Sequence, residues 1–186
     1  MDFSLEKAYG EPHRRYHTFE HISACLERLS EWPDLAENER RILAWALLFH
    51  DVVYDPKASD NESRSAELAR RYLPSFGLTP DEVEEAERLI LLTAGHETAN
   101  DDSLGRVMVC IDLAILAAPL DVYGDYVHGV RMEYAHVSDE AWRRGRSAIL
   151  HRFLASPVIF PDQDFSRKYE ARARANIKTE LEALGA

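Results

Sequence analysis

A histidine and an aspartate stand side by side near the end of an apolar run, as His50-Asp51. A second histidine, His21, lies upstream in the run YHTFEH, and Asp112 lies downstream in the apolar run VMVCIDLAILAA. Neutral imidazole nitrogens and carboxylate oxygens are ligands that divalent metals accept together. If the two side chains of the pair point into one cavity, they can reach the same ion. The pattern therefore favours a metal-dependent enzyme.

Asp112 is the acid that most needs a partner. Its neighbours are almost all apolar, and an ionised carboxylate is costly to bury without a positive charge or strong hydrogen bonds. The partner is a metal ion or an arginine, and the residues alone leave both open.

His17, Glu20 and His21 lie at positions i, i+3 and i+4. If one helix contains all three, their Cβ atoms lie about 5–6 Å apart on one face. Glu20 can then orient a ligand imidazole, or it can face solvent. The same run, HTFEH, fits the inverted zinc-peptidase pattern H-x-x-E-H, in which two histidines bind zinc and the glutamate activates water. That alternative leaves the His-Asp pair and Asp112 unused and needs a further glutamate ligand.

The elements that must position these residues are predicted to be helices. Apolar residues recur every three or four positions, as in Ile42, Leu43, Ala46 and Leu47, and no stretch alternates as a strand would. The sequence therefore predicts an all-α fold, a bundle of about eight helices in one domain over residues 1–186. The predicted helices are Thr18–Glu31, Ala36–Val53, Glu62–Phe76, Pro80–His96, Leu104–Ala117, Leu120–His136, Asp139–Ala155 and Asp164–Leu184.

Composition restricts the class of partner. The formal net charge of −11 argues against a nucleic-acid polymer, because nonspecific affinity depends on clustered Lys and Arg. The N-terminus lacks a signal-peptide pattern, and no apolar run approaches the roughly 20 residues of a membrane span. Cys25 and Cys110 lie in apolar contexts and are predicted to be buried. We expect a cytoplasmic protein without a membrane partner, and a homo-oligomer is compatible with the sequence.

His21, His50-Asp51 and Asp112, all on predicted helices, resemble the HD-domain superfamily of metal-dependent phosphohydrolases. The resemblance covers nearly the whole chain, which looks like a small bacterial group of predicted HD phosphohydrolases. The segments that carry it are RRYHTFEHI, LLFHDVVYDP, DNESRSAELA, DLAIL, VRMEY and FSRKYEARARANIKTEL. It implies an HD-type helical bundle in which His21, His50, Asp51 and Asp112 bind a divalent ion. Mn, Mg, Fe, Co, Ni and Zn are all candidates.

The resemblance also implies a proton donor. In the related cyclic-nucleotide phosphodiesterases, a Tyr-His-Asn-x-x-His run contains the acid that protonates the leaving oxygen. His17 has that position here, with Thr18 in place of Asn. Some HD nucleotidases place a catalytic acid shortly after the His-Asp pair, and we name Glu62 together with Asp51 as candidates. The run DNES that contains Glu62 can instead cap a helix, and the nearby Asp55 can be a turn residue.

Three further residues are candidates for binding substrate. His96, at the expected end of its helix, can contact a phosphate or a second metal ion, or it can cap the helix at the surface. Arg64 and Arg131 can grip a phosphate through two hydrogen bonds, or they can be solvated or paired with surface acids. The expected substrate is a small phosphorylated molecule, with nucleotides included.

The function predicted from the sequence is hydrolysis of a phosphomonoester or phosphodiester by metal-activated water. Besides the zinc peptidase, two alternatives stay open. One is a sensor module that binds metal and nucleotide without catalysis. The other is a di-iron oxygenase on the same fold, which needs more histidine ligands than the sequence offers.

Overall fold

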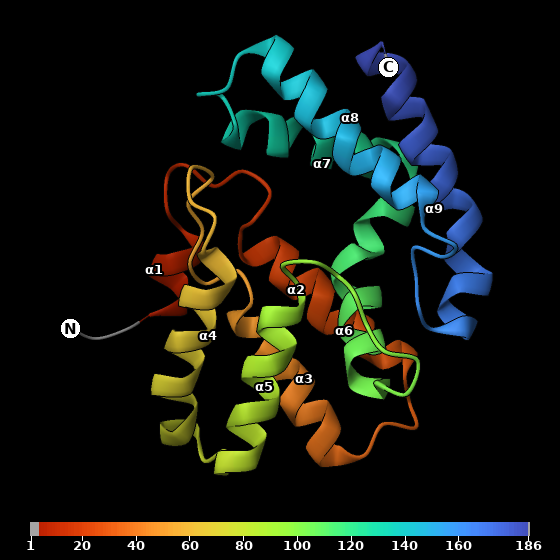
Figure 1. The fold of residues 1–186 in the computed structure, drawn as a ribbon. Coiled ribbons are helices and arrows are strands. Elements are labelled where there is room, and N and C mark those ends of the chain that lie inside the picture. The colour runs from red at the N-terminus through yellow and green to blue at the C-terminus, as the bar shows by residue number, and fades with distance from the viewer. Residues whose placement is uncertain (1–3, 186) are drawn as a thin grey trace. The chain divides into compact units, whose positions relative to one another are not determined.

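A computed structural model describes residues 4–185 of the chain (Figure 1). Over this range it consists of helices and connecting turns, without a strand, which confirms the all-α prediction. The α-helices are α1 (Leu5–Tyr9), α2 (Phe19–Arg28), α3 (Glu37–Phe49), α4 (Asn61–Tyr72), α5 (Pro80–Leu92), α6 (Ser103–Asp112), α7 (Leu120–Glu133), α8 (Asp139–Ala155) and α9 (Gln163–Leu184). Short 3₁₀ helices are η1 (Leu29–Glu31), η2 (Leu73–Phe76) and η3 (Leu113–Ala117).

The chain divides into two compact units, with the boundary between Asp112 and Leu113. In the first unit α3 packs against α2, α4, α5 and α6. The apolar stripe predicted on α3 forms its buried face, since Ile42, Leu43, Ala46 and Leu47 are all buried. The first unit therefore has a core of its own around α3. The expected single domain over residues 1–186 stays a prediction.

The second unit contains η3, α7, α8 and α9. Helix α9 packs against η3 and α8, and α7 packs against η3. The apolar side chains of Leu116, Leu150 and Ile177 are buried, and so are the charged side chains of Arg146 and Glu180. This unit thus holds a buried ion pair within its apolar core.

Two predicted helices end earlier than expected, and both ends matter for the site. Helix α3 stops at Phe49 rather than at Val53, with His50 as its C-cap residue. Helix α5 stops at Leu92 rather than at His96, because the following residues form tighter turns that bond three positions back, from Thr93 to Gly95. Candidate site residues therefore lie on the turns that follow these helices.

Other expectations can be compared with the structure directly. Cys25 and Cys110 are both buried, as predicted. Thr79 and Glu82 cap the start of α5 reciprocally. Between residues 4 and 185 no single helix is long and apolar enough to cross a membrane. Two consecutive helical stretches, Ser103–Ala117 and Leu120–Glu133, reach that length and composition only when taken together.

Candidate metal centre

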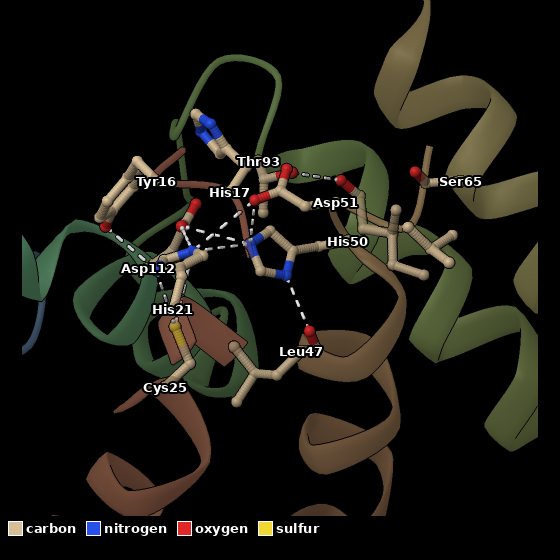
Figure 2. Close-up of polar contacts among 12 residues, drawn as sticks. Tyr16, His17, His21, Cys25, Leu47, His50, Asp51, Ser65, Thr93 and Asp112 are labelled. Carbon is tan, nitrogen blue, oxygen red and sulfur yellow. Dashed lines mark hydrogen bonds and ion pairs between the residues drawn. The ribbon is translucent and has the colours of Figure 1, made fainter. Parts of the chain in front are cut away.

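The four predicted ligands converge within the first unit (Figure 2). His21 Nε2 lies 3.4 Å from His50 Nε2, 3.6 Å from Asp51 Oδ2 and 3.5 Å from Asp112 Oδ1. His50 Nε2 lies 3.0 Å from the same Asp51 oxygen and 3.4 Å from the same Asp112 oxygen. Each imidazole nitrogen therefore faces both carboxylates.

These separations fit the ligands of one ion. With metal–ligand bonds of about 2.1 Å, two ligand atoms are about 3.0 Å apart at a right angle and about 3.4 Å apart at the tetrahedral angle. The five distances that involve an imidazole nitrogen run from 3.0 to 3.6 Å. The donor atoms of His21, His50 and Asp51 all lie within 4.8 Å of one another. Two imidazole nitrogens and two carboxylate oxygens suit a divalent transition metal. The side chains present therefore fit a divalent cation.

Helix packing brings the donors together from three places in the sequence. His21 is the third residue of α2, His50-Asp51 follows the end of α3, and Asp112 is the last residue of α6. The three helices pack against one another in pairs. In addition, the carbonyl end of α3 carries partial negative charge, which favours a cation beside it. The helical framework thus positions the donors and adds to the negative potential.

Hydrogen bonds on the far side of each imidazole aim its Nε2 at the cluster. His50 Nδ1 lies 2.8 Å from the carbonyl oxygen of Leu47, which can only accept, so Nδ1 carries the hydrogen. The Nε2 lone pair of a neutral His50 then faces the carboxylates. His21 Nδ1 lies 3.0 Å from the Tyr16 hydroxyl and 3.7 Å from Cys25 Sγ. Such outer contacts fix ring orientation in metal sites.

Burial and charge shift the pKa values of the cluster in opposite directions. Burial by itself would lower the pKa of His50, but the Asp51 and Asp112 carboxylates outweigh it and raise that pKa well above its usual value. Burial would raise the pKa of both carboxyl groups, but the charge on His50 outweighs it and lowers both. The carboxylates therefore stay ionised and favour a positive charge on His50. A divalent cation would compete with that proton.

His17 lies beside the four ligands rather than among them. Helix α2 begins at Phe19, close to the predicted start, with Thr18 as its N-cap residue. His17 is therefore outside the helix, and the condition for a shared helical face with Glu20 is not met. The His17 ring stacks on Tyr54 with a centroid distance of 4.1 Å, and its centroid is 6.1 Å from that of His21. Against the effect of burial, which raises the pKa of Asp51, the charge of His17 lowers that pKa, though less than the charge of His50 does.

Glu20 is exposed to solvent on α2. The Nδ1 atom of His21 faces Tyr16 and Cys25 instead. Of the two roles considered for Glu20, the structure favours the solvent-facing one. The zinc-peptidase arrangement, which needs both histidines and the glutamate of HTFEH together, is not formed.

His96 contacts the second oxygen of Asp112. Its Nε2 lies 2.9 Å from Asp112 Oδ2, whereas the other oxygen faces His21 and His50. The backbone of His96 has φ = 57°, in the left-handed region that few residues other than glycine adopt. This conformation, four residues after the end of α5, directs the ring at the candidate ligand. A role in binding substrate stays a prediction.

The segment after the His-Asp pair forms a turn and a helix start. Asp55 accepts the Lys57 N–H through its side chain, and its backbone exchanges hydrogen bonds with the Asn61 side chain. Glu62 lies partly buried in the first turn of α4. Exposed Arg64 lies 3.9 Å from Asp60. Asp55 is thus a turn residue, as considered, whereas Asp60 of the DNES run is the N-cap residue of α4 without a side-chain capping hydrogen bond. The catalytic role of Glu62 and the phosphate-binding role of Arg64 stay predictions.

Arg131 belongs to the second unit. Its guanidinium donates to the carbonyl oxygens of Tyr134 and Val137 and to the Asp139 carboxylate, and it lies over the Trp142 ring. These contacts give it a structural role at the end of α7. Phosphate binding by Arg131 stays a prediction.

Three residues near the candidate ligands were not singled out from the sequence. Cys25 follows His21 by four positions on α2, so helical spacing could have indicated the contact. Tyr16 lies in the YHTFEH run but had no distinguishing feature among the tyrosines. Arg14 makes contacts up to 38 residues away, and no local pattern points to them.

Comparisons of the chain with protein-family models, with curated proteins and with solved structures gave no match. The chemistry of the donor atoms and their surroundings is therefore the basis for assigning a function.

Proposed function

We propose that the chain is a metal-dependent phosphohydrolase of the HD type, which cleaves a phosphomonoester or phosphodiester, with nucleotides among the candidate substrates. The observation that carries the proposal is that two imidazole nitrogens lie 3.0 to 3.6 Å from each other and from oxygens of two carboxylates. The resemblance of the same four residues to the HD motif favours phosphoryl transfer over other metal chemistry.

In this proposal His21, His50, Asp51 and Asp112 hold a divalent ion. Bound there, the ion supplies a water activated for attack and a positive charge that stabilises the phosphoryl oxygens. The two ionised carboxylates attract the cation. The Leu47 carbonyl keeps the His50 ring in the orientation that binds it.

His17 is the proton donor in the proposed reaction. Departure of an alkoxide from phosphorus requires a proton, and a positioned histidine can supply it. The His17 ring lies next to the proposed ligands, with its centroid 6.1 Å from that of His21. The charge of His17 lowers the pKa of Asp51, so the two side chains interact electrostatically.

The test begins with metal-stripped protein reloaded separately with Mn, Mg, Fe, Co, Ni or Zn. Metal content is measured by elemental analysis, and phosphate release is measured on a panel of nucleotides, phosphomonoesters and phosphodiesters. We expect phosphate release that requires a metal. Asp51→Ala protein purified in parallel controls for contaminating phosphatases, because it should release none.

Other outcomes would identify the alternatives. If no ion supports phosphate release, yet a nucleotide raises the Tm of the loaded protein, the chain is a sensor module. Oxygen-dependent turnover by the iron form would indicate an oxygenase. Cleavage of peptides without any phosphoesterase activity would indicate a zinc peptidase, against the solvent-exposed position of Glu20.

A further inference from the structure

Arg14 is a buried arginine on the segment that carries His17. Only 3% of its surface is exposed, and residues 10–18 between α1 and α2 contain no helix. Its Nη1 atom donates to the carbonyl oxygen of His17 at 2.9 Å and to that of Asp51 at 2.8 Å. Its Nη2 atom donates to the carbonyl oxygen of Val52 at 3.1 Å. One guanidinium therefore joins the backbone at His17 to the backbone just after α3.

The guanidinium is itself held on every side. Its Nε atom donates to Glu11 Oε2 at 3.1 Å, and its central carbon lies 5.1 Å from the Tyr9 ring centroid and 5.4 Å from that of Tyr54. A planar group with five N–H donors can make these contacts together, whereas the compact ammonium of lysine cannot. The site is thus specific for arginine.

Tyr54 connects the same guanidinium to the His17 ring. One side chain, Tyr54, contacts Arg14 and also stacks on the His17 imidazole, with 4.1 Å between ring centroids. Arg14 therefore acts on both parts of His17: directly on the backbone and through Tyr54 on the ring. Because Arg14 also bonds to the Asp51 carbonyl, both contacts hold His17 in place relative to Asp51.

We propose that Arg14 is a positioning residue that fixes His17 beside the metal ligand Asp51. The catalytic consequence rests on the proposed function, but the positioning itself is a property of the metal-free protein. Without the guanidinium, the helix-free segment loses its hydrogen bonds to the carbonyl oxygens of Asp51 and Val52 and keeps the one between His13 and the Tyr54 carbonyl. The His17 backbone then loses its own bond to Arg14, and the ring loses its fixed place. Misplacement of a catalytic group by about 1 Å can cost about 100-fold in rate.

The direct test is NMR of the His17 ring protons in metal-free protein. Stacking on Tyr54 shifts these protons upfield, and the signals are assigned by their absence from His17→Ala protein. We expect Arg14→Gln to abolish the upfield shift. The matched control is Arg40→Gln, because Arg40 also donates to two carbonyl oxygens, those of Leu29 and Trp32, within the first unit. That variant should keep the shift.

The second test uses metal-loaded protein. Arg14→Gln should still bind metal, while kcat falls by about 100-fold towards the value for His17→Ala. The double variant should fall no further than His17→Ala alone, because the two residues act through the same proton transfer. A purely structural loss would instead add to the effect of His17→Ala.

If the Arg14→Gln protein does not fold, Arg14→Lys replaces it in both tests. It keeps the charge but not the set of carbonyl contacts, so we expect it also to lose the upfield shift. A folded Arg14 variant that retains the shift would overturn the proposal, as would a lost shift with unchanged kcat in an active enzyme. If the wild-type protein hydrolyses no phosphoester but the shift still depends on Arg14, the positioning stands and the proposed function fails.

Discussion

Each of the two units buries a cluster of ionisable side chains, and the two clusters differ in how their polar atoms are paired. In the second unit Arg146 donates from Nε to Glu180 Oε1 at 2.7 Å and from Nη2 to Oε2 at 3.1 Å. The Tyr123 hydroxyl donates to the same carboxylate. Donors meet acceptors and the charges of the ion pair cancel, so this cluster is complete without a ligand.

In the first unit the Nε2 atom of a neutral His50 is an acceptor, and so are the oxygens of Asp51 and Asp112 that face it. The Nε2 atom of His21 faces the same two carboxylates, and His96 Nε2 contacts the second oxygen of Asp112. Only a proton or a cation can resolve this excess of acceptors. The difference teaches that pairing, rather than burial or charge alone, distinguishes a structural cluster from a candidate binding site.

The pKa shifts follow the same division. Burial would lower the pKa of Arg146, but Tyr126 and Glu180 outweigh it and raise the pKa, so this arginine stays charged at every ordinary pH. Burial and Glu180 raise the pKa of Tyr123, which stays neutral. The first cluster instead contains histidines, whose charge can change near neutral pH. Proton and metal binding are therefore linked in the first unit only.

The largest effect should come from removing a ligand of the first cluster. Asp51→Ala, and likewise His50→Ala, should weaken metal binding by more than about 100-fold, since changes to outer contacts alone cost 10–100-fold. Isothermal titration calorimetry measures the affinity, and circular dichroism checks the fold. Exposed Glu20 provides the control, because Glu20→Gln should bind metal normally. Wild-type affinity in both ligand variants would remove these residues from the site.

Breaking the second cluster should affect stability and leave metal binding intact. Glu180→Ala leaves Arg146 buried without its counter-charge, and such losses cost about 3–5 kcal/mol in the free energy of unfolding. Urea denaturation measures this loss. Replacing both partners, as Arg146→Met with Glu180→Leu, should restore much of the stability because an apolar pair needs no partner. A loss below about 1 kcal/mol in the single variant would contradict the structural role of the pair.

At the first cluster, His17→Ala should affect kcat without affecting metal binding. The four ligands remain, so metal affinity should stay unchanged, whereas kcat should fall by about 100-fold or more through loss of the general acid. Steady-state kinetics on a substrate from the phosphoester panel measures the change. Since leaving groups of low pKa need no proton, a nitrophenyl ester should lose less rate than an alkyl ester. Equal losses on both would argue against proton donation.

The smallest effect concerns pH in the metal-free protein. The raised pKa of His50 stabilises the folded protein fully at pH values below about 6.5, the pKa of histidine in an unfolded chain. This stabilisation is lost as the pH rises through the pKa of His50 in the folded protein. The lowered pKa values of Asp51 and Asp112 contribute stability above about 3.9, which is lost as pH falls through the folded values. Together these groups stabilise the metal-free protein most between about pH 4 and 6.5.

Thermal unfolding with and without metal checks this expectation. The rise in Tm on adding metal should grow from pH 6 to pH 8, because the proton on His50 competes less with the cation. Glu180→Gln should leave that trend unchanged, since Glu180 is not among the proposed ligands. A metal effect independent of pH would show that His50 is not a ligand.

The sequence by itself determined the helical fold class and the four residues that converge. Apolar periodicity is a local property, and it predicted the buried face of α3 and eight of the helices. The short helix α1 was not predicted, because five residues are too few to show helical periodicity. A carboxylate among apolar residues needs a partner whatever the details of packing, which singled out Asp112. The resemblance to the HD motif then implied the set of four candidate ligands.

Tertiary structure decided how these residues are oriented and what surrounds them. The positions of His17 and His96 depend on where α2 begins and α5 ends, which a few hydrogen bonds at each terminus determine. Arg14 acquires its role only through carbonyl groups 37 and 38 residues away at Asp51 and Val52. Long-range contacts of this kind leave no periodic signal in the sequence, because the chain must fold before the atoms can meet.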